Sequence, residues 1–229
     1  RPGDVASMNY LATAHLAAST LKNALLIDMG TTTTDIIPII DGSPQNVGQT
    51  DADRLASGEL VYTGLTRTAV MAVVDAVPFQ GAWVPICREY FATMSDVQRV
   101  LEALPSGVDD QQTADGRGKS LHESTSRLAR MIGRDGADGS ADDWRSMARY
   151  VAGAQFTPIN EAVGLVVSRH PKLISSPIVT TGCAIASLEH WAKGQGLQPL
   201  AYQTLFDDPK PDPHHINTCA TAAAIAALA

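Results

Sequence analysis

Apolar side chains follow two different spacings in the first forty residues. In residues 5–21 they recur near helical spacing, which predicts a helix. Residues 24–29 (ALLIDM) and 35–40 (DIIPII) are instead nearly continuous apolar runs, which predict two buried strands. The runs are close enough in sequence to pair antiparallel, and Pro38 confines the second strand to a sheet edge or a bulge. The pattern therefore predicts a helix followed by a β-hairpin.

Further along the chain, strand-like patterns give way to helix-like ones. Three short runs predict further strands: ELVYTG (59–64), TAVMAVV (68–74) and WVPIC (83–87). Five stretches predict helices: 94–104, 120–133, 142–170, 184–193 and 217–229. Ser120 and Glu123 form a capping box at the start of the second, and Pro158 should break or kink the third. A strand at 176–182 (SPIVTTG) precedes the fourth.

This order of elements predicts the fold class. Strands come first, helices later, and a strand–Gly–helix unit lies near the end, which predicts an α/β fold with a mixed sheet and flanking helices. We expect a strand-rich part over 24–90 and a helix-rich part over 94–229.

Composition narrows the class of protein. The 229 residues are 45% hydrophobic and 18% charged, which is typical of a globular chain. The net charge is −7 and Lys and Arg are scattered, which argues against nucleic acid or an anionic membrane as the main partner. Cys87, Cys183 and Cys219 form no CxxC pair, a pattern typical of reduced thiols, and the apolar tract 220–229 is about half as long as a bilayer-spanning helix. We therefore expect a cytoplasmic protein.

Four threonines interrupt the predicted hairpin. Thr31, Thr32, Thr33 and Thr34 follow Gly30, and the group is flanked by Asp28 and Asp35. A tight loop turns backbone N–H groups toward one point, and the hydroxyls add donors for a phosphate. Because carboxylates repel phosphate, Asp28 and Asp35 would instead hold a Mg²⁺ ion that binds it. The stretch predicts a magnesium–diphosphate site, and the alternative is a plain hairpin whose threonines favour β structure.

Two segments resemble the actin-like ATPase superfamily, whose fold is ribonuclease H-like. IDMGTTTTDIIPI (27–39) resembles its second phosphate hairpin, and SPIVTTGCAIASLEHWAKGQG (176–196) resembles its strand–Gly–helix motif near the nucleoside. The resemblance implies ligand contacts at Gly182 and Cys183. Ala184 stands where the superfamily usually has a second glycine, a departure that weighs against purine binding.

Three further segments, 48–70, 89–97 and 114–135, resemble one branch of the hydantoinase/oxoprolinase-like proteins. That branch is linked to tetrahydromethanopterin-dependent C1 transfer and to methanofuran biosynthesis. The resemblance implies a transferase that joins a glutamyl-tyramine or tyrosine-type phenol to an aminomethylfuran diphosphate, forming an ether and releasing diphosphate. The alternatives are an ATP-dependent kinase or hydantoinase-type enzyme of the same fold, or a non-catalytic subunit.

The resemblance also implies that the first half of the fold lies outside this chain. The superfamily opens with a strand–Asp–Gly phosphate loop that precedes the segment corresponding to the helix at 5–21. Residues 1–229 are therefore expected to be the C-terminal portion of the fold. We expect a preceding N-terminal half, or a second copy, to complete the site.

Other polar residues are candidates with alternatives. Glu59 is a candidate proton acceptor for the phenol, or a partner of Arg54 or Arg67. Arg67 could bind diphosphate or a substrate carboxylate through its guanidinium, or form a surface ion pair. The segment 114–120 (ADGRGKS) is no Walker A motif, and we expect it to cap the next helix, with Asp115 toward the ligand. The spacing of 207–215 (DDPKPDPHH) fits a solvated loop better than a zinc site.

Overall fold

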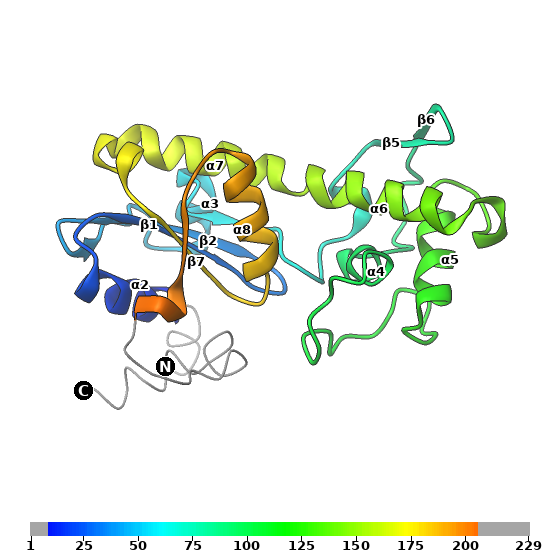
Figure 1. Ribbon diagram of the computed structural model, residues 1–229, viewed down its shortest axis with the longest axis horizontal. Coiled ribbons are helices and arrows are strands. Elements are labelled where there is room, and N and C mark those ends of the chain that lie inside the picture. Colours follow the sequence, from blue (N-terminus) through cyan, green and yellow to red (C-terminus); the bar gives the residue numbers. More distant parts are fainter. Residues whose placement is uncertain (1–8, 206–229) are drawn as a thin grey trace. The chain divides into compact units, whose positions relative to one another are not determined.

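The computed structural model describes residues 9–205 of the chain (Figure 1). These residues divide into two compact units. Unit 1 contains residues 9–62 and 159–205, and unit 2 is Thr63–Pro158. Within the described residues, no helix combines the length and the apolar character needed to span a bilayer.

Unit 1 is built on a six-stranded mixed sheet. Its strands are β1 (Ala24–Met29), β2 (Thr34–Ile40), β3 (Ser43–Pro44), β4 (Leu60–Val61), β7 (Ile178–Thr181) and β8 (Pro199–Ala201). The order is β3-β2-β1-β7-β8, with β4 also paired to β2. The pair β1–β2 is antiparallel, whereas β1–β7 and β7–β8 are parallel. The predicted α/β fold with a mixed sheet and the predicted hairpin are thus confirmed.

Helices surround this sheet. They are α2 (Asn9–Thr20), α3 (Asp51–Ser57), α8 (Ile185–Gly194) and α7 (Phe156–Arg169), which contains the boundary between the units, with 3₁₀ turns η3 (Pro171–Ser175) and η4 (Tyr202–Leu205). Alanines of α2 pack with alternate residues of the strands, Leu26, Ile37, Ile39 and Val179 among them, and with the ring of Tyr202. This packing covers one face of the sheet (Figure 1).

Pro38 was predicted to confine its strand to a sheet edge or a bulge, and the edge position is wrong. β2 pairs with β1 on one side and with β3 and β4 on the other. The N–H of Ile36 donates to the carbonyl of Glu59 at 2.9 Å, so by alternation the nitrogen of Pro38 also faces the β3–β4 side. It lies in the gap between these two short strands, where no donor is required.

Unit 2 is mainly helical. It contains α4 (Met94–Val100), α5 (Leu121–Met131), α6 (Ala141–Ala154), the hairpin of β5 (Ala76–Phe79) and β6 (Ala82–Pro85), and the 3₁₀ turns η1 (Val70–Ala72) and η2 (Gly136–Asp138). One apolar core joins the three helices, the hairpin and η1, and its most buried members include Met94, Leu128, Trp144 and Val151.

Sequence patterns placed most elements correctly and a few wrongly. The predicted strand at 68–74 is wrong: Val70 and Val74 are buried four residues apart while Met71 is exposed, a helical rather than alternating pattern that gives η1. The helix α3 was missed, although Thr50 and Asp53 form a capping box at its start. The predicted helix at 142–170 is two helices that meet at Gln155, three residues before Pro158.

The remaining helix predictions agree with the structure where it describes them. The capping box of Ser120 and Glu123 is present at the start of α5. The predicted helices at 94–104 and 184–193 correspond to α4, which ends earlier, and to α8. The start of the predicted helix 5–21, the helix 217–229, the loop 207–215 and Cys219 lie outside the described residues.

Candidate functional site

Two carboxylates face each other beside the threonine loop. In the antiparallel register of β1 and β2, Asp28 is directly opposite Asp35, and Met29 is opposite Thr34. Residues that are directly opposite share a face of the sheet, so both carboxylates project from the face that carries α2. The loop between the strands is tight, since the N–H of Gly30 donates to the carbonyl of Thr33 at 2.9 Å.

The threonines differ in their surroundings. Thr31, Thr32 and Thr33 are half-buried in the loop, and the hydroxyls of Thr31 and Thr32 are 3.5 Å apart. Thr34 is fully buried, and because it precedes Asp35 in the strand its side chain points to the opposite face. The first three threonines are therefore better placed than Thr34 for a ligand on the carboxylate face.

Both aspartates of the pair have pKa values above the ordinary value of an aspartate. Desolvation, followed by the negative charge of Asp35, raises the pKa of Asp28 to about 7. Desolvation also raises the pKa of Asp35, although a hydrogen bond from Arg54 opposes the shift. A cation between the carboxylates would relieve this repulsion.

Arg54 is the counter-ion of Asp35. Its Nη2 lies 2.5 Å from Oδ1 of Asp35 and donates to the carbonyl of Glu59 at 3.2 Å. The guanidinium lies over the ring of Tyr10, 3.5 Å from the centroid, and the residue is only 3% exposed. Sequence reasoning treated Arg54 only as a partner for Glu59. The capping box of Thr50 and Asp53 could have predicted the short helix α3 that contains this arginine, but not its contact with the hairpin.

Gly182 brings the β7–α8 corner against Asp28. Its φ is +91°, and a Cβ atom there would lie 2.3 Å from the carbonyl oxygen of Met29 and 2.5 Å from Oδ1 of Asp28. Only glycine fits this approach. The N–H of Ala184 also donates to the carbonyl of Met29, at 3.3 Å. The structure thus brings together Gly182 and the acidic pair, as the two predicted ligand-binding segments require.

Cys183 lies beside this corner as a buried thiol. Its Sγ is 3.6 Å from the carbonyl oxygen of Met29. Burial, followed by the charge of Asp28, raises the pKa of Cys183 to about 12. The side chain is therefore a neutral thiol at physiological pH, which suits a lining role better than a nucleophilic one.

Glu59 is engaged by backbone donors. Its two carboxylate oxygens accept the N–H groups of Val47 at 2.7 Å and Gly48 at 2.9 Å, and Arg169 lies 3.7 Å away. The side chain is fully buried. This geometry fixes the segment before α3, so a role in proton transfer would compete with these hydrogen bonds.

Arg67 and Asp115 belong to unit 2, whereas the acidic pair belongs to unit 1. Arg67 forms the surface ion pair that was its alternative role, with Nη2 3.3 Å from Asp110 and both side chains largely exposed. Asp115 accepts from the backbone of Arg117 and from Arg127, both at 3.1 Å. Although desolvation opposes it, this hydrogen bonding lowers the pKa of Asp115.

The acidic pair fits a weakly held divalent cation. Among residues 9–205, no cluster of three or more His, Cys, Asp or Glu side chains could hold a metal ion. Asp28 and Asp35 would therefore supply two carboxylates, and water or phosphate oxygens would supply the remaining ligands. Mg²⁺ is often bound in this way, through one or two carboxylates and a substrate phosphate.

Comparison with known proteins identifies the family. A family model described as Hydantoinase/oxoprolinase matches residues 2–190. The chain belongs to the hydantoinase/oxoprolinase family.

Two curated relatives carry the same name, (4-{4-[2-(gamma-L-glutamylamino)ethyl]phenoxymethyl}furan-2-yl)methanamine synthase. The protein from Methanocaldococcus jannaschii is 33% identical over 168 residues, covering 73% of this chain and 51% of the relative. The protein from Methanococcus vannielii is 35% identical over 122 residues, covering 53% of this chain and 54% of the relative. The chain thus spans about half the length of the curated relatives it matches.

Proposed function

We propose that this chain is part of a transferase of methanofuran-type cofactor biosynthesis. The observation that carries the proposal is the similarity to two proteins named as the synthase above. The reaction joins a glutamyl-tyramine or tyrosine-type phenol to an aminomethylfuran diphosphate. The hairpin of Asp28 and Asp35, with its loop of donors, supplies a site suited to the diphosphate.

The chemistry is a substitution at the carbon next to the furan ring. The phenol oxygen forms a C–O bond to that carbon, while the bond from carbon to the diphosphate oxygen breaks. The bonding pair leaves with diphosphate, and the phenol proton passes to a base. Because negative charge grows on the leaving oxygens, donors that are fixed in advance lower the barrier.

Different residues of unit 1 would bind the diphosphate and the magnesium ion. Backbone N–H groups and hydroxyls of the Gly30–Thr33 loop bind diphosphate oxygens, and Asp28 and Asp35 would hold a magnesium ion. When bound, the ion supplies positive charge to the leaving group. Arg54 favours the ionised form of Asp35 and orients its carboxylate through their 2.5 Å contact. Gly182 and Cys183 lie next to Asp28 at the β7–α8 corner, where they would line the site.

We place the fold in the actin-like ATPase superfamily. An antiparallel hairpin beside a parallel strand, followed by a glycine and a helix, supports this assignment. In that fold a second phosphate loop comes from the preceding half, which would be supplied by a longer chain or by a second copy. Glu59, Arg67 and Asp115 stay predicted contributors, and all three already have protein partners in the structure.

An activity assay on the full-length protein tests the proposal. The protein is incubated with the phenol, the aminomethylfuran diphosphate and Mg²⁺, and both diphosphate release and the mass of the ether product are followed. Equal amounts of the two products are expected, without any need for ATP. ATP-dependent turnover instead would favour a kinase or a hydantoinase-type enzyme, the alternatives consistent with the family.

A further inference from the structure

Tyr10 of α2 covers the counter-ion of the acidic pair. The guanidinium of Arg54 lies over the ring of Tyr10, 3.5 Å from its centroid, and the tyrosine is itself only half-buried. Arg54 is nevertheless only 3% exposed. A cation–π contact is strongest when the cation is shielded from water, as it is here. The proposed transferase chemistry gives Tyr10 no role, although Arg54 links its ring to Asp35.

The stem of the Arg54 side chain is confined as well. A Cβ atom at Gly48 would lie 2.6 Å from Cγ of Arg54 and 2.6 Å from its backbone nitrogen, so the stem packs closely against the backbone at Gly48. That backbone is held in turn, since the N–H of Gly48 donates to the carboxylate of Glu59 at 2.9 Å. The stem and the guanidinium are therefore confined by different residues, Gly48 and Tyr10.

Hydrogen bonds by themselves do not fix the plane of the guanidinium. Within residues 9–205, Nη2 donates to Oδ1 of Asp35 at 2.5 Å and to the carbonyl of Glu59 at 3.2 Å. Nη1 is 3.9 Å from a carboxylate oxygen of Asp51, and Nε is buried without an acceptor in that part of the chain. A planar group held at one corner can tilt about that corner. A ring packed against its face opposes this tilt.

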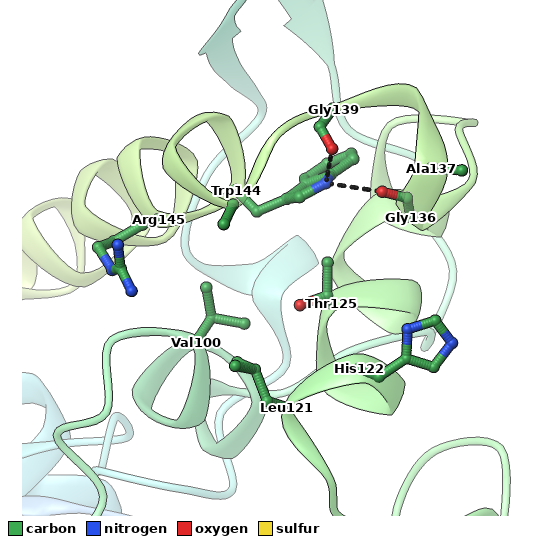
Figure 2. A pocket seen from close by; sticks show the side chains of 10 residues that line it. Val100, Leu121, His122, Thr125, Gly136, Ala137, Gly139, Trp144 and Arg145 are labelled. Atoms are coloured by element: carbon green, nitrogen blue, oxygen red, sulfur yellow. Dashed lines mark hydrogen bonds between the residues drawn. The ribbon is translucent and has the colours of Figure 1, made fainter.

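A buried aromatic ring of unit 2 has a different environment (Figure 2). Trp144 is 2% exposed, and its ring packs against Phe79 with centroids 4.6 Å apart. Its indole N–H donates to the carbonyls of Gly136 at 3.0 Å and Gly139 at 3.2 Å (Figure 2). That ring is part of the apolar core. Tyr10 differs because the group on its face is a charged side chain beside the acidic pair.

We propose that Tyr10 is a positioning residue of the acidic pair, because its ring holds the Arg54 guanidinium against Asp35. The carboxylate of Asp35 is thereby kept opposite Asp28, where both can serve one cation–diphosphate ligand. The consequence for ligand binding rests on the proposed function, whereas the contact between Tyr10 and Arg54 does not. Because the face of the ring acts and the hydroxyl does not, phenylalanine should replace Tyr10 and leucine should not.

Nuclear magnetic resonance of the protein labelled with ¹⁵N-arginine tests this contact without any ligand. Arg54→Met identifies the Nε–H signal of Arg54 by its absence. Since no acceptor among the described residues holds this N–H, its protection from solvent exchange reports how well the side chain is covered. Exchange should be as slow in Tyr10→Phe as in the wild type and about tenfold faster in Tyr10→Leu, as loss of a shielded cation–π contact implies. Equal exchange in all three proteins overturns the proposal.

Leu16→Ala separates this role from the general packing of α2. Leu16 is partly buried, lies on the same helix as Tyr10 and packs against the same core. Its truncation should lower the free energy of unfolding and leave the exchange of the Arg54 Nε–H unchanged. If exchange became as fast in Leu16→Ala as in Tyr10→Leu, loosening of the helix would be sufficient, and the specific role of the ring would be overturned.

Calorimetric titration with pyrophosphate in the presence of Mg²⁺ measures the effect on the site. Tyr10→Phe should bind pyrophosphate as the wild type does, and Tyr10→Leu about tenfold more weakly, the same factor as for the exchange of the Arg54 N–H. Wild-type affinity in Tyr10→Leu overturns the positioning role. If the wild type binds no pyrophosphate, the diphosphate site itself is wrong, and the exchange of the Arg54 N–H decides whether Tyr10 holds Arg54.

Discussion

Asp28 and Asp35 lie directly opposite each other on β1 and β2, and of the two it is Asp35 that has Arg54 as a counter-ion, at 2.5 Å. The pair is therefore asymmetric. Asp35 has a partner that favours its ionised form, whereas burial and Asp35 itself raise the pKa of Asp28. This asymmetry makes Asp28 the group whose charge responds to pH and to a bound cation.

The stability of the metal-free protein should reflect the titration of Asp28. An acid whose folded pKa is about 7, against about 4 unfolded, favours folding fully below pH 4. That contribution is lost as the pH rises from about 4 through 7, by at most about 4 kcal/mol for three pKa units. Asp28→Asn cannot ionise and should flatten this part of the profile. The free energy of unfolding of both proteins is measured by urea titration in EDTA at several pH values.

The control for this experiment is Asp41→Asn. Asp41 is an exposed turn residue with φ +52°, a conformation that asparagine also adopts readily. The hydrogen bond from Lys172 lowers the pKa of Asp41. The contribution of Asp41 to stability is therefore lost at acidic pH rather than near neutrality. A profile for Asp28→Asn that matches the wild type between pH 4 and 7 would show that Asp28 is not perturbed.

Gly182→Ala should destabilise unit 1 strongly. The new methyl group would lie 2.3 Å from the carbonyl oxygen of Met29, and the backbone has φ +91°. The combination of clash and strain should cost about 2–4 kcal/mol. Gly164→Ala in α7 is the matched control: apart from its chain neighbours and the backbone of its own helix turn, nothing lies within 4 Å of its new methyl group, and the helix should gain up to about 1 kcal/mol. Equal unfolding midpoints for the two variants would contradict this account.

Arg54→Met should leave Asp35, whose side chain is 20% exposed, beside Asp28 without its cation. Loss of one partner of a buried ion pair typically costs about 3–5 kcal/mol, part of which protonation of the remaining acid can recover. The loss should therefore be smaller at pH 5 than at pH 8. Arg88→Met removes a pair with Asp75 in which both side chains are more than four-fifths exposed, and should change stability by about 0.5 kcal/mol or less. Denaturant unfolding of both variants at the two pH values makes the comparison.

Glu59→Gln tests whether this side chain is a loop anchor. An amide keeps one acceptor oxygen, so the N–H of Val47 or of Gly48 loses its partner, at a cost of about 1–3 kcal/mol. Hydrogen exchange at these two amides should become faster in the variant. Unchanged exchange together with a loss of turnover in the full-length protein would instead support proton transfer by Glu59.

The hairpin could be predicted from sequence because local patterns determine it. Two apolar runs of strand length flank a polar loop, and pairing around that loop places Asp28 near Asp35. The fit of the β7–α8 corner was only partly predictable: glycine at 182 indicated a close approach, but the oxygen atoms it approaches come from a strand about 150 residues earlier. Resemblance, rather than periodicity, had linked the two segments.

Other features depend on contacts that local patterns do not encode. The role of Arg54 requires a short helix to place it against a strand 19 residues away in sequence. The run at 68–74 is rich in valine, which favours strands, yet Val70 and Val74 are both buried in the core of unit 2 and the backbone forms the 3₁₀ turn η1 at Val70–Ala72. The partner of Arg67, Asp110, likewise follows from tertiary structure.

Binding of inorganic pyrophosphate tests the central claim most directly. The chain, Asp28→Asn and Asp41→Asn are titrated by calorimetry with pyrophosphate, ADP and ATP, first with Mg²⁺ and then with EDTA. The account predicts magnesium-dependent binding of pyrophosphate without preference for ATP, lost in Asp28→Asn and kept in Asp41→Asn. Pyrophosphate binding that is equal in the two variants, or that needs no Mg²⁺, would contradict a diphosphate site at the Asp28–Asp35 hairpin.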